Sequence, residues 1–134
     1  CEKKAMTKLK VISTKKAPSA IGAYSQAIKA GDFMYISGQI PLDPETMDIV
    51  SKDFKNQISQ VLKNLDVIVI EAGFKLSDIV KLNVYLKNLE HFQLVNDAMI
   101  DSFQKPYPAR AAVEVSRLPR DVLVEMDAIV YIGD

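Results

Sequence analysis

The sequence has a single cysteine, no tryptophan, only 5 glycines and no net charge. Because that cysteine is Cys1, the chain cannot close an internal disulfide or build a cysteine-based zinc site. The longest relevant apolar run, residues 65–70, is interrupted by Asp66, so no stretch approaches the ~18 apolar residues of a membrane span. The chain has 17 Lys and Arg and 17 Asp and Glu, so it lacks the broad positive potential that attracts nucleic acid. Neither a nucleic-acid nor a membrane partner is expected.

The composition is that of one folded domain. The chain has 134 residues, of which 49% are apolar and 25% charged, close to the usual globular mixture. We assign residues 9–134 to a single domain and residues 1–8 to a leader and N-terminal tail. Met6 resembles a natural start, so the residues before it are interpreted as an expression remnant or, alternatively, as a processed end with a lipid-modified Cys1.

The apolar periodicity predicts six strands and two helices. Asp53 is suited to the N-cap of the first helix and Gly73 to the position after its end, while Gly31 fits a tight hairpin. The strands are predicted at residues 9–13, 24–29, 33–38, 79–86, 109–115 and 122–132, and the helices at residues 53–73 and 89–103. This βββαβαββ order predicts an α+β domain with one mixed sheet, both helices on one face and the other face open.

Charged residues interrupt the alternation of the last two strands. Alternation places Arg110 and Glu125 on the polar face of their strands, and we expect both on the same face of the sheet. A hairpin between these strands would set Arg110 opposite Asp127 and Ala112 opposite Glu125. Solvated charges paired across an exposed sheet would explain this pattern without any function.

Large apolar side chains on the same face favour a second interpretation. Leu123, Ile129 and Tyr131 alternate with the acidic residues of the last strand. A half-apolar sheet face without helices commonly needs another subunit to cover it. If a subunit does so, Arg110 becomes a partly desolvated donor for a carboxylate or phosphate, and Glu125 becomes a candidate proton-transfer group.

Several separated motifs resemble those of the Rid family of reactive-intermediate deaminases, also called the YjgF/YER057c/UK114 family. The resemblance extends from about Val11 to the C-terminus, in the family's order and with compatible spacing. The motifs are APSAIGAYSQ at residues 17–26, SGQI at 37–40, PARAAVEV at 108–115, LP at 118–119 and VEMDA at 124–128.

The resemblance implies a chorismate-mutase-like fold and a cytoplasmic homotrimer, with a central barrel and clefts between neighbouring subunits. It also implies hydrolysis of 2-enamine and 2-imine intermediates, such as 2-aminoacrylate, to 2-keto acids and ammonia, without a cofactor. The substrate would be a small-molecule carboxylate.

The resemblance further implies roles for individual residues. Arg110 matches the arginine that grips the substrate carboxylate, and Glu125 matches the acid that manages water and a proton. Ala112 stands where part of the family has cysteine, which makes thiol chemistry unexpected. The other positions matching the substrate cleft are Tyr24, Ser37, Gly38 and Asn96.

Two other functions remain open at this stage. The same cleft could bind a 2-keto acid or a related carboxylate without turnover, as a regulatory module. RNA cleavage or translation inhibition is attached to some members of the family, but the balanced charge argues against it. No metal site is expected, since His91 is the only histidine.

Overall fold

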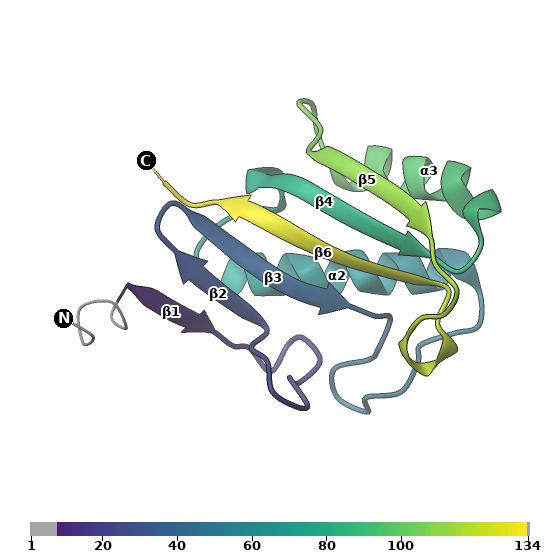
Figure 1. The fold of residues 1–134 in the computed structure, drawn as a ribbon, viewed down its shortest axis with the longest axis horizontal. Helices are drawn as coiled ribbons and strands as arrows, with labels where there is room; N and C mark the ends of the chain where they lie inside the picture. The colour runs from purple at the N-terminus through teal and green to yellow at the C-terminus, as the bar shows by residue number, and fades with distance from the viewer. Residues whose placement is uncertain (1–7, 134) are drawn as a thin grey trace.

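The computed structural model describes residues 8–133, and its elements follow the predicted order (Figure 1). The leader expected before Met6 lies outside the described residues. Three short 3-10 turns, η1 (Leu76–Asp78), η2 (Leu89–His91) and η3 (Pro119–Asp121), connect the main elements. These elements are β1 (Leu9–Ile12), β2 (Ala27–Ala30), β3 (Phe33–Gln39), α2 (Phe54–Glu71), β4 (Ile79–Leu86), α3 (Phe92–Ser102), β5 (Ala109–Glu114) and β6 (Val124–Tyr131).

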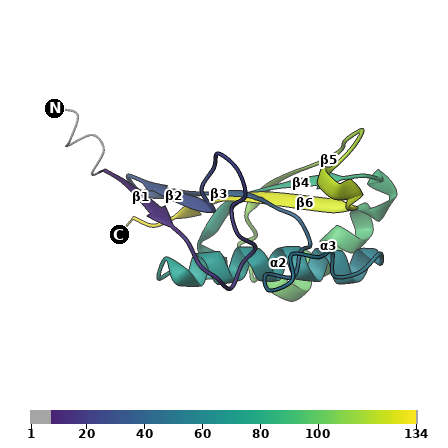
Figure 2. The ribbon, with the colours of Figure 1, turned by 90° about the horizontal axis from the view of Figure 1, so that it is seen from below.

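The strands form one six-stranded sheet in the order β1-β2-β3-β6-β4-β5. Neighbouring strands are antiparallel except for β4 and β5, so the sheet is mixed as predicted. Figure 2 shows α2 and α3 on one side of the sheet, with the other side uncovered. Within residues 8–133, no helix is long and apolar enough to cross a membrane.

Helix α2 begins and ends where its sequence predicts. Asp53 is its N-cap and accepts a hydrogen bond from the Asn56 backbone N–H at 3.2 Å. Gly73 follows the helix with φ +89°, a conformation that costs glycine little. One stripe of the helix is buried against the sheet, including the fully buried Val61 and Leu65.

Strand β6 lies near the middle of the sheet and carries the core. Val124, Met126, Ala128 and Val130 are at most 2% exposed beneath the helices. The alternate residues, from Glu125 to Ile129, are half-buried on the uncovered face. The predicted division of this strand into an apolar and a mixed face is therefore confirmed.

The predicted hairpin between the last two strands is wrong, because β4 lies between β5 and β6. Helix α3 connects β4 to β5, and a strand–helix–strand connection joins parallel neighbours. Arg110 therefore stands beside Leu82 instead of Asp127, and Ala112 stands beside Val84 instead of Glu125.

The expectation that Arg110 and Glu125 share a face is also wrong. Leu82, the neighbour of Arg110, is fully buried under the helices. Glu125 instead stands beside Tyr85, whose position alternates with that of Leu82 along β4. The two groups consequently project from opposite faces of one sheet.

Candidate functional site

The structure separates the predicted site residues into two groups. Arg110, Ala112 and Asn96 lie on the helix-covered side at the β5 edge, and we call this group the arginine half-site. Tyr24, Gly38 and Glu125 line a hollow associated with the uncovered face, which we call the glutamate half-site.

Arg110 dominates the first group and is held by one face of α3. Its Nη1 donates to Asn96 Oδ1 at 2.6 Å and approaches Met99 Sδ at 3.5 Å. Its guanidinium carbon lies 4.9 Å from the centre of the Phe92 ring. These three side chains are four and three residues apart, so they fall on one side of the helix.

The arginine half-site is suited to a small anion. Pockets for small molecules commonly measure about 300–1,000 Å³. The hollow at Arg110, which Tyr107 and Pro108 also line, measures about 510 Å³. Within residues 8–133, the hydrogen bonds of Arg110 all use Nη1. The Nε and Nη2 edge can therefore meet a carboxylate through two parallel hydrogen bonds.

Ala112 lies on the same face of β5 as Arg110, two residues further along. It is half-buried, stands beside Val84 and packs against the hydrophobic core. Its methyl group provides no proton or nucleophile, so only its backbone and its small size can serve a ligand there.

The glutamate half-site is a hollow of about 360 Å³ between loops and the sheet. Besides Tyr24, Gly38 and Glu125, its lining includes Pro119 and Arg120 of η3. Tyr24 is 52% exposed, and its hydroxyl accepts a hydrogen bond from the Ile21 backbone N–H at 3.3 Å.

Gly38 and Glu125 are in close contact. The register of β3 against β6 shifts between Ile36 and Gln39, which indicates a bulge at this point. A Cβ atom on Gly38 would overlap Glu125 Oε2 and lie 3.0 Å from its Cδ. The carboxyl group of Glu125 therefore occupies the space that any other residue at position 38 would need.

Ser37 does not line this hollow. Its hydroxyl donates to the Ser25 backbone carbonyl at 2.5 Å, and its backbone N–H donates to the Gln26 carbonyl at 2.9 Å. Ser37 thus holds the bulged end of β3 to the segment that follows Tyr24.

The surroundings of Glu125 favour the protonated form of its carboxyl. Burial raises the pKa of its carboxyl above the ordinary value, and the charge of the nearby Asp127 raises this pKa further. A carboxyl with a raised pKa keeps its proton to higher pH, which general acid catalysis requires.

A polar network beside Glu125 was not predicted from the sequence. Asp127 accepts hydrogen bonds from Tyr85 Oη at 2.8 Å and from Asn83 Nδ2 at 2.7 Å. The bond to Asp127, together with burial, raises the pKa of Tyr85 to about 12. Asn83 and Tyr85 alternate with apolar residues in β4, a signal visible in the sequence, but their partner depends on the pairing of β4 with β6.

His91, to which the sequence analysis gave no role, packs against α2. Its ring stacks on Phe54 with centroids 4.2 Å apart. Over the described part of the chain, no group of three or more His, Cys, Asp or Glu side chains could hold a metal ion.

Comparisons with known proteins identify the class to which this fold and site belong. A protein-family model described as Endoribonuclease L-PSP matches residues 14–132. A RutC family protein of Pyrococcus abyssi is 54% identical, with 90% of this chain and 95% of the relative covered. The 2-iminobutanoate/2-iminopropanoate deaminase of Salmonella typhimurium is 45% identical, with the same coverage of 90% and 95%.

Solved structures agree with these relatives. The crystal structure of RidA from the Antarctic bacterium Psychrobacter sp. matches with a TM-score of 0.88 at 47% identity, covering 92% of this chain and 99% of that one. The chain therefore belongs to the Rid family. The resemblance found in its sequence motifs is confirmed, and so is the α+β fold with one mixed sheet.

Proposed function

We propose that this protein hydrolyses 2-enamine and 2-imine intermediates, such as 2-aminoacrylate and 2-iminopropanoate, to 2-keto acids and ammonia. Membership of the Rid family supports the proposal, as does the deaminase activity in the name of the Salmonella relative. The main observation in support of this proposal is the presence of two half-sites. In one, Arg110 is positioned to bind a carboxylate, and in the other, Glu125 is suited to transfer a proton.

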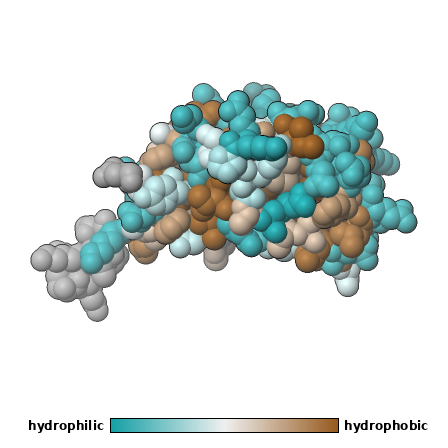
Figure 3. Space-filling model, turned by 90° about the horizontal axis from the view of Figure 1, so that it is seen from above, coloured by the Kyte–Doolittle hydropathy of each residue, from teal (hydrophilic) through white to brown (hydrophobic). Residues whose placement is uncertain are grey.

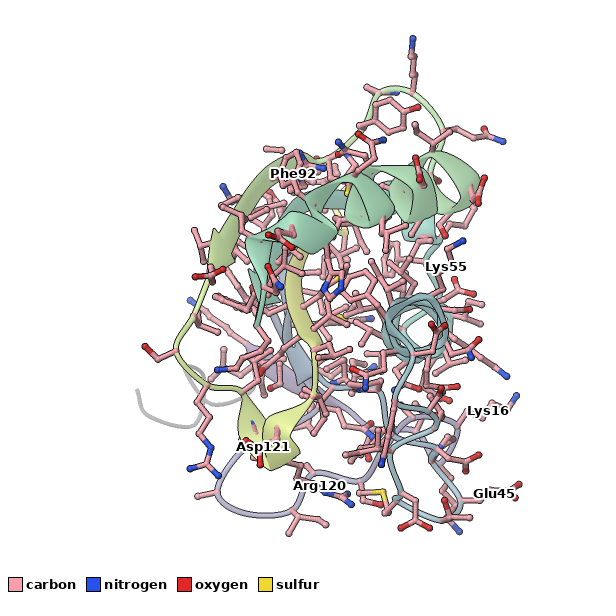
Figure 4. The ribbon with its side chains drawn as sticks, turned by 90° about the vertical axis from the view of Figure 1, so that its right-hand side faces the viewer. Lys16, Glu45, Lys55, Phe92, Arg120 and Asp121 are labelled. Atoms are coloured by element: carbon pink, nitrogen blue, oxygen red, sulfur yellow. The ribbon has the colours of Figure 1, made fainter. Side chains whose placement is uncertain are left out.

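The catalytic unit that we propose is a cleft between copies of the chain in a homotrimer with a central barrel. Arg110 and Glu125 project from opposite faces of one sheet, so a single chain does not direct them at one small molecule. Phe92 and Arg120, which belong to the two half-sites, lie well apart in Figure 4. A cleft in which Arg110 comes from one copy and Glu125 from its neighbour would bring both groups to one substrate molecule.

The surface of the chain offers two regions for such an assembly. Strand β5 ends the sheet, so the arginine half-site lies at an edge that a neighbour can approach. Brown apolar patches interrupt the hydrophilic surface in Figure 3, which views the molecule from the side of β5 and α3. The uncovered face also exposes large side chains, among them Tyr35 and Tyr131.

In the proposed reaction, Arg110 binds the substrate carboxylate and holds the imine carbon beside Glu125. Water adds to that carbon and gives a carbinolamine, with a proton passing to the nitrogen. The Glu125 carboxyl then protonates the nitrogen, the carbon–nitrogen bond breaks and ammonia leaves. The hydroxyl gives its proton back to the Glu125 carboxylate and becomes the keto oxygen. Tyr24 and Asn96 are proposed to orient substrate and Arg110, respectively, and the small Ala112 leaves room beside them.

The proposal is tested by generating 2-aminoacrylate from serine with a dehydratase and following the release of pyruvate. Wild-type protein should accelerate this release, and both Arg110→Ala and Glu125→Ala should abolish most of the acceleration. The control is Arg117→Ala, because Arg117 forms only an exposed ion pair with Asp121 at 2.9 Å. Saturable binding of pyruvate without any acceleration would instead support a non-catalytic binding module.

A further inference from the structure

Asp127 lies two residues from the proposed acid, Glu125, on the same face of β6. The two residues alternate on the uncovered face of β6, separated by Met126, which points into the core. Tyr85 stands directly beside Glu125 on β4, and Asn83 stands beside Asp127. Four polar side chains thus occupy adjoining positions on two paired strands.

The hydrogen bonds within this group favour one arrangement of charge. Although Tyr85 is the direct neighbour of Glu125, its hydroxyl donates to Asp127, which also receives the Asn83 amide. Both oxygens of Asp127 are therefore stabilised as acceptors, a state suited to an ionised carboxylate. Glu125 receives neither bond and rests against Gly38.

No cation in the described chain neutralises Asp127 through an ion pair, since the salt bridge found within residues 8–133 joins Arg117 and Asp121. Lys81 shares the uncovered face but stands beside Ile129, four residues along β6 from Glu125 and two from Asp127. Arg120 lines the same hollow as Glu125, with its Nη1 bound to the Met47 carbonyl.

Lys87 follows Tyr85 by two residues and bonds through its backbone to Leu123, but its Nζ donates to the Ser116 carbonyl. The other neighbours of Glu125 among the described residues carry no charge. Tyr85 is kept as a hydroxyl donor by a pKa raised to about 12. Strand β3 contributes Gly38, and the loop before β2 contributes the phenol of Tyr24. Within one chain, Asp127 is therefore the charged group that acts on the Glu125 carboxyl, while the Arg120 guanidinium lines the same hollow.

We propose that Asp127, fixed by Tyr85 and Asn83, is a positioning residue that keeps the proton on Glu125, so that Glu125 can deliver it to departing ammonia. The negative charge of Asp127 on the same face of β6 disfavours a second negative charge, so Glu125 keeps its proton to higher pH than it would beside a neutral residue. The inference rests on the proposed deaminase function for the fate of this proton, but the location of the proton does not depend on activity.

The experiment follows the Glu125 carboxyl itself by carbon-13 NMR of the assembled protein labelled in glutamate, with Glu125→Gln used to assign its resonance. In Asp127→Asn, which preserves shape but removes the charge, the titration midpoint of Glu125 should move to lower pH. Asp101→Asn is the matched control, because it removes an exposed carboxylate from α3 on the helix-covered side. It should leave the midpoint unchanged.

Tyr85→Phe provides a second variant that keeps the ring and deletes only the hydroxyl. Loss of this donor should shift the midpoint in the same direction by a smaller amount, because Asp127 is then less firmly held beside Glu125. The alkaline limb of the pyruvate-release profile should follow the NMR midpoints in each variant.

The outcomes separate the two proposals. An unchanged midpoint in folded Asp127→Asn and folded Tyr85→Phe overturns the role of Asp127, whatever the activity. A shifted midpoint in a protein that releases no pyruvate supports the proposed charge arrangement and contradicts the proposed deaminase function.

Discussion

The two half-sites hold their charged groups in opposite ways. Around Arg110, an amide oxygen, a sulfur and an aromatic ring all favour the positive charge. Around Glu125, burial and the neighbouring Asp127 disfavour the negative charge. A group that binds an anionic substrate benefits from surroundings that stabilise its charge, whereas a group that transfers a proton must be able to change its charge. The difference matches the roles proposed for the two residues.

Mixing subunits tests most directly whether the two half-sites of one cleft come from different copies of the chain. Arg110→Ala and Glu125→Ala should each be nearly inactive when expressed alone. When the two variants are expressed together, roughly one quarter of the clefts between copies should combine an intact arginine with an intact glutamate, since each group comes from either variant at even odds. Pyruvate release by the purified mixture should recover to about that fraction of the wild-type rate.

The control mixture is Arg110→Ala with Arg110→Met, which lacks the guanidinium in every subunit and should stay inactive. If the first mixture also remains inactive although mass spectrometry shows mixed oligomers, both groups must act within one chain, and the proposed cleft between copies is refuted.

Sequence reasoning located the elements better than it located their neighbours. The cap at Asp53, the turn at Gly31 and the alternation of β6 are local signals, and each has the predicted position in the structure. The pairing of β5 depended on which strand lies beside it, and alternation within a strand contains no information on that choice. The error in pairing then placed Arg110 on the wrong face.

The candidate site was predictable only through its motifs. Alternation singled out Arg110 and Glu125 as polar exceptions, but the family resemblance was needed to select Tyr24, Gly38 and Asn96. The network around Asp127 was missed because its hydrogen bonds join residues 42 and 44 positions apart. Such contacts follow from the register between strands, which the sequence does not specify on its own.

Gly38→Ala tests how strongly activity depends on the position of the Glu125 carboxyl in the glutamate half-site. The new Cβ must displace the Glu125 carboxyl, whereas the backbone at Gly38 has no positive φ that would exclude alanine. Since misplacing a catalytic group by about 1 Å can cost up to about 100-fold, kcat/KM should fall on the order of 10- to 100-fold. The free energy of unfolding should stay close to that of the wild type.

Gly31→Ala should behave in the reverse manner. Gly31 has φ +61° and open space around it, so alanine there meets strain without touching the site. We expect a loss of about 1–2 kcal/mol in the free energy of unfolding and no change in kcat/KM. Equal losses of activity in the two variants would show that Gly38 acts only through stability.

Phe92→Leu tests how strongly α3 positions Arg110. The contact between the guanidinium and the ring should be worth about 0.5–1 kcal/mol, so its removal should raise KM by roughly two- to fivefold with little effect on kcat. The matched control is Phe74→Leu, which removes the contact of Lys29 Nζ with a ring 5.3 Å away and should leave KM unchanged. A fall in kcat alone would contradict a role in binding.

The smallest expected effect is on the free energy of unfolding, whose dependence on pH should differ between variants of Glu125 and of Arg110. The raised pKa of Glu125 means that the folded chain binds this proton more tightly than the unfolded chain does. Stability should therefore decline as pH rises from the ordinary glutamate pKa through the raised one. Gln cannot ionise at position 125. The free energy of unfolding of Glu125→Gln, measured by urea titration at fixed protein concentration, should therefore exceed that of the wild type at pH values above this window. Below the window the two values should converge.

Arg110→Met is the control, and its difference from the wild type in the free energy of unfolding should not depend on pH over the same range, because a guanidinium stays charged throughout. A constant difference for Glu125→Gln as well would mean that the carboxyl is not disfavoured by its surroundings.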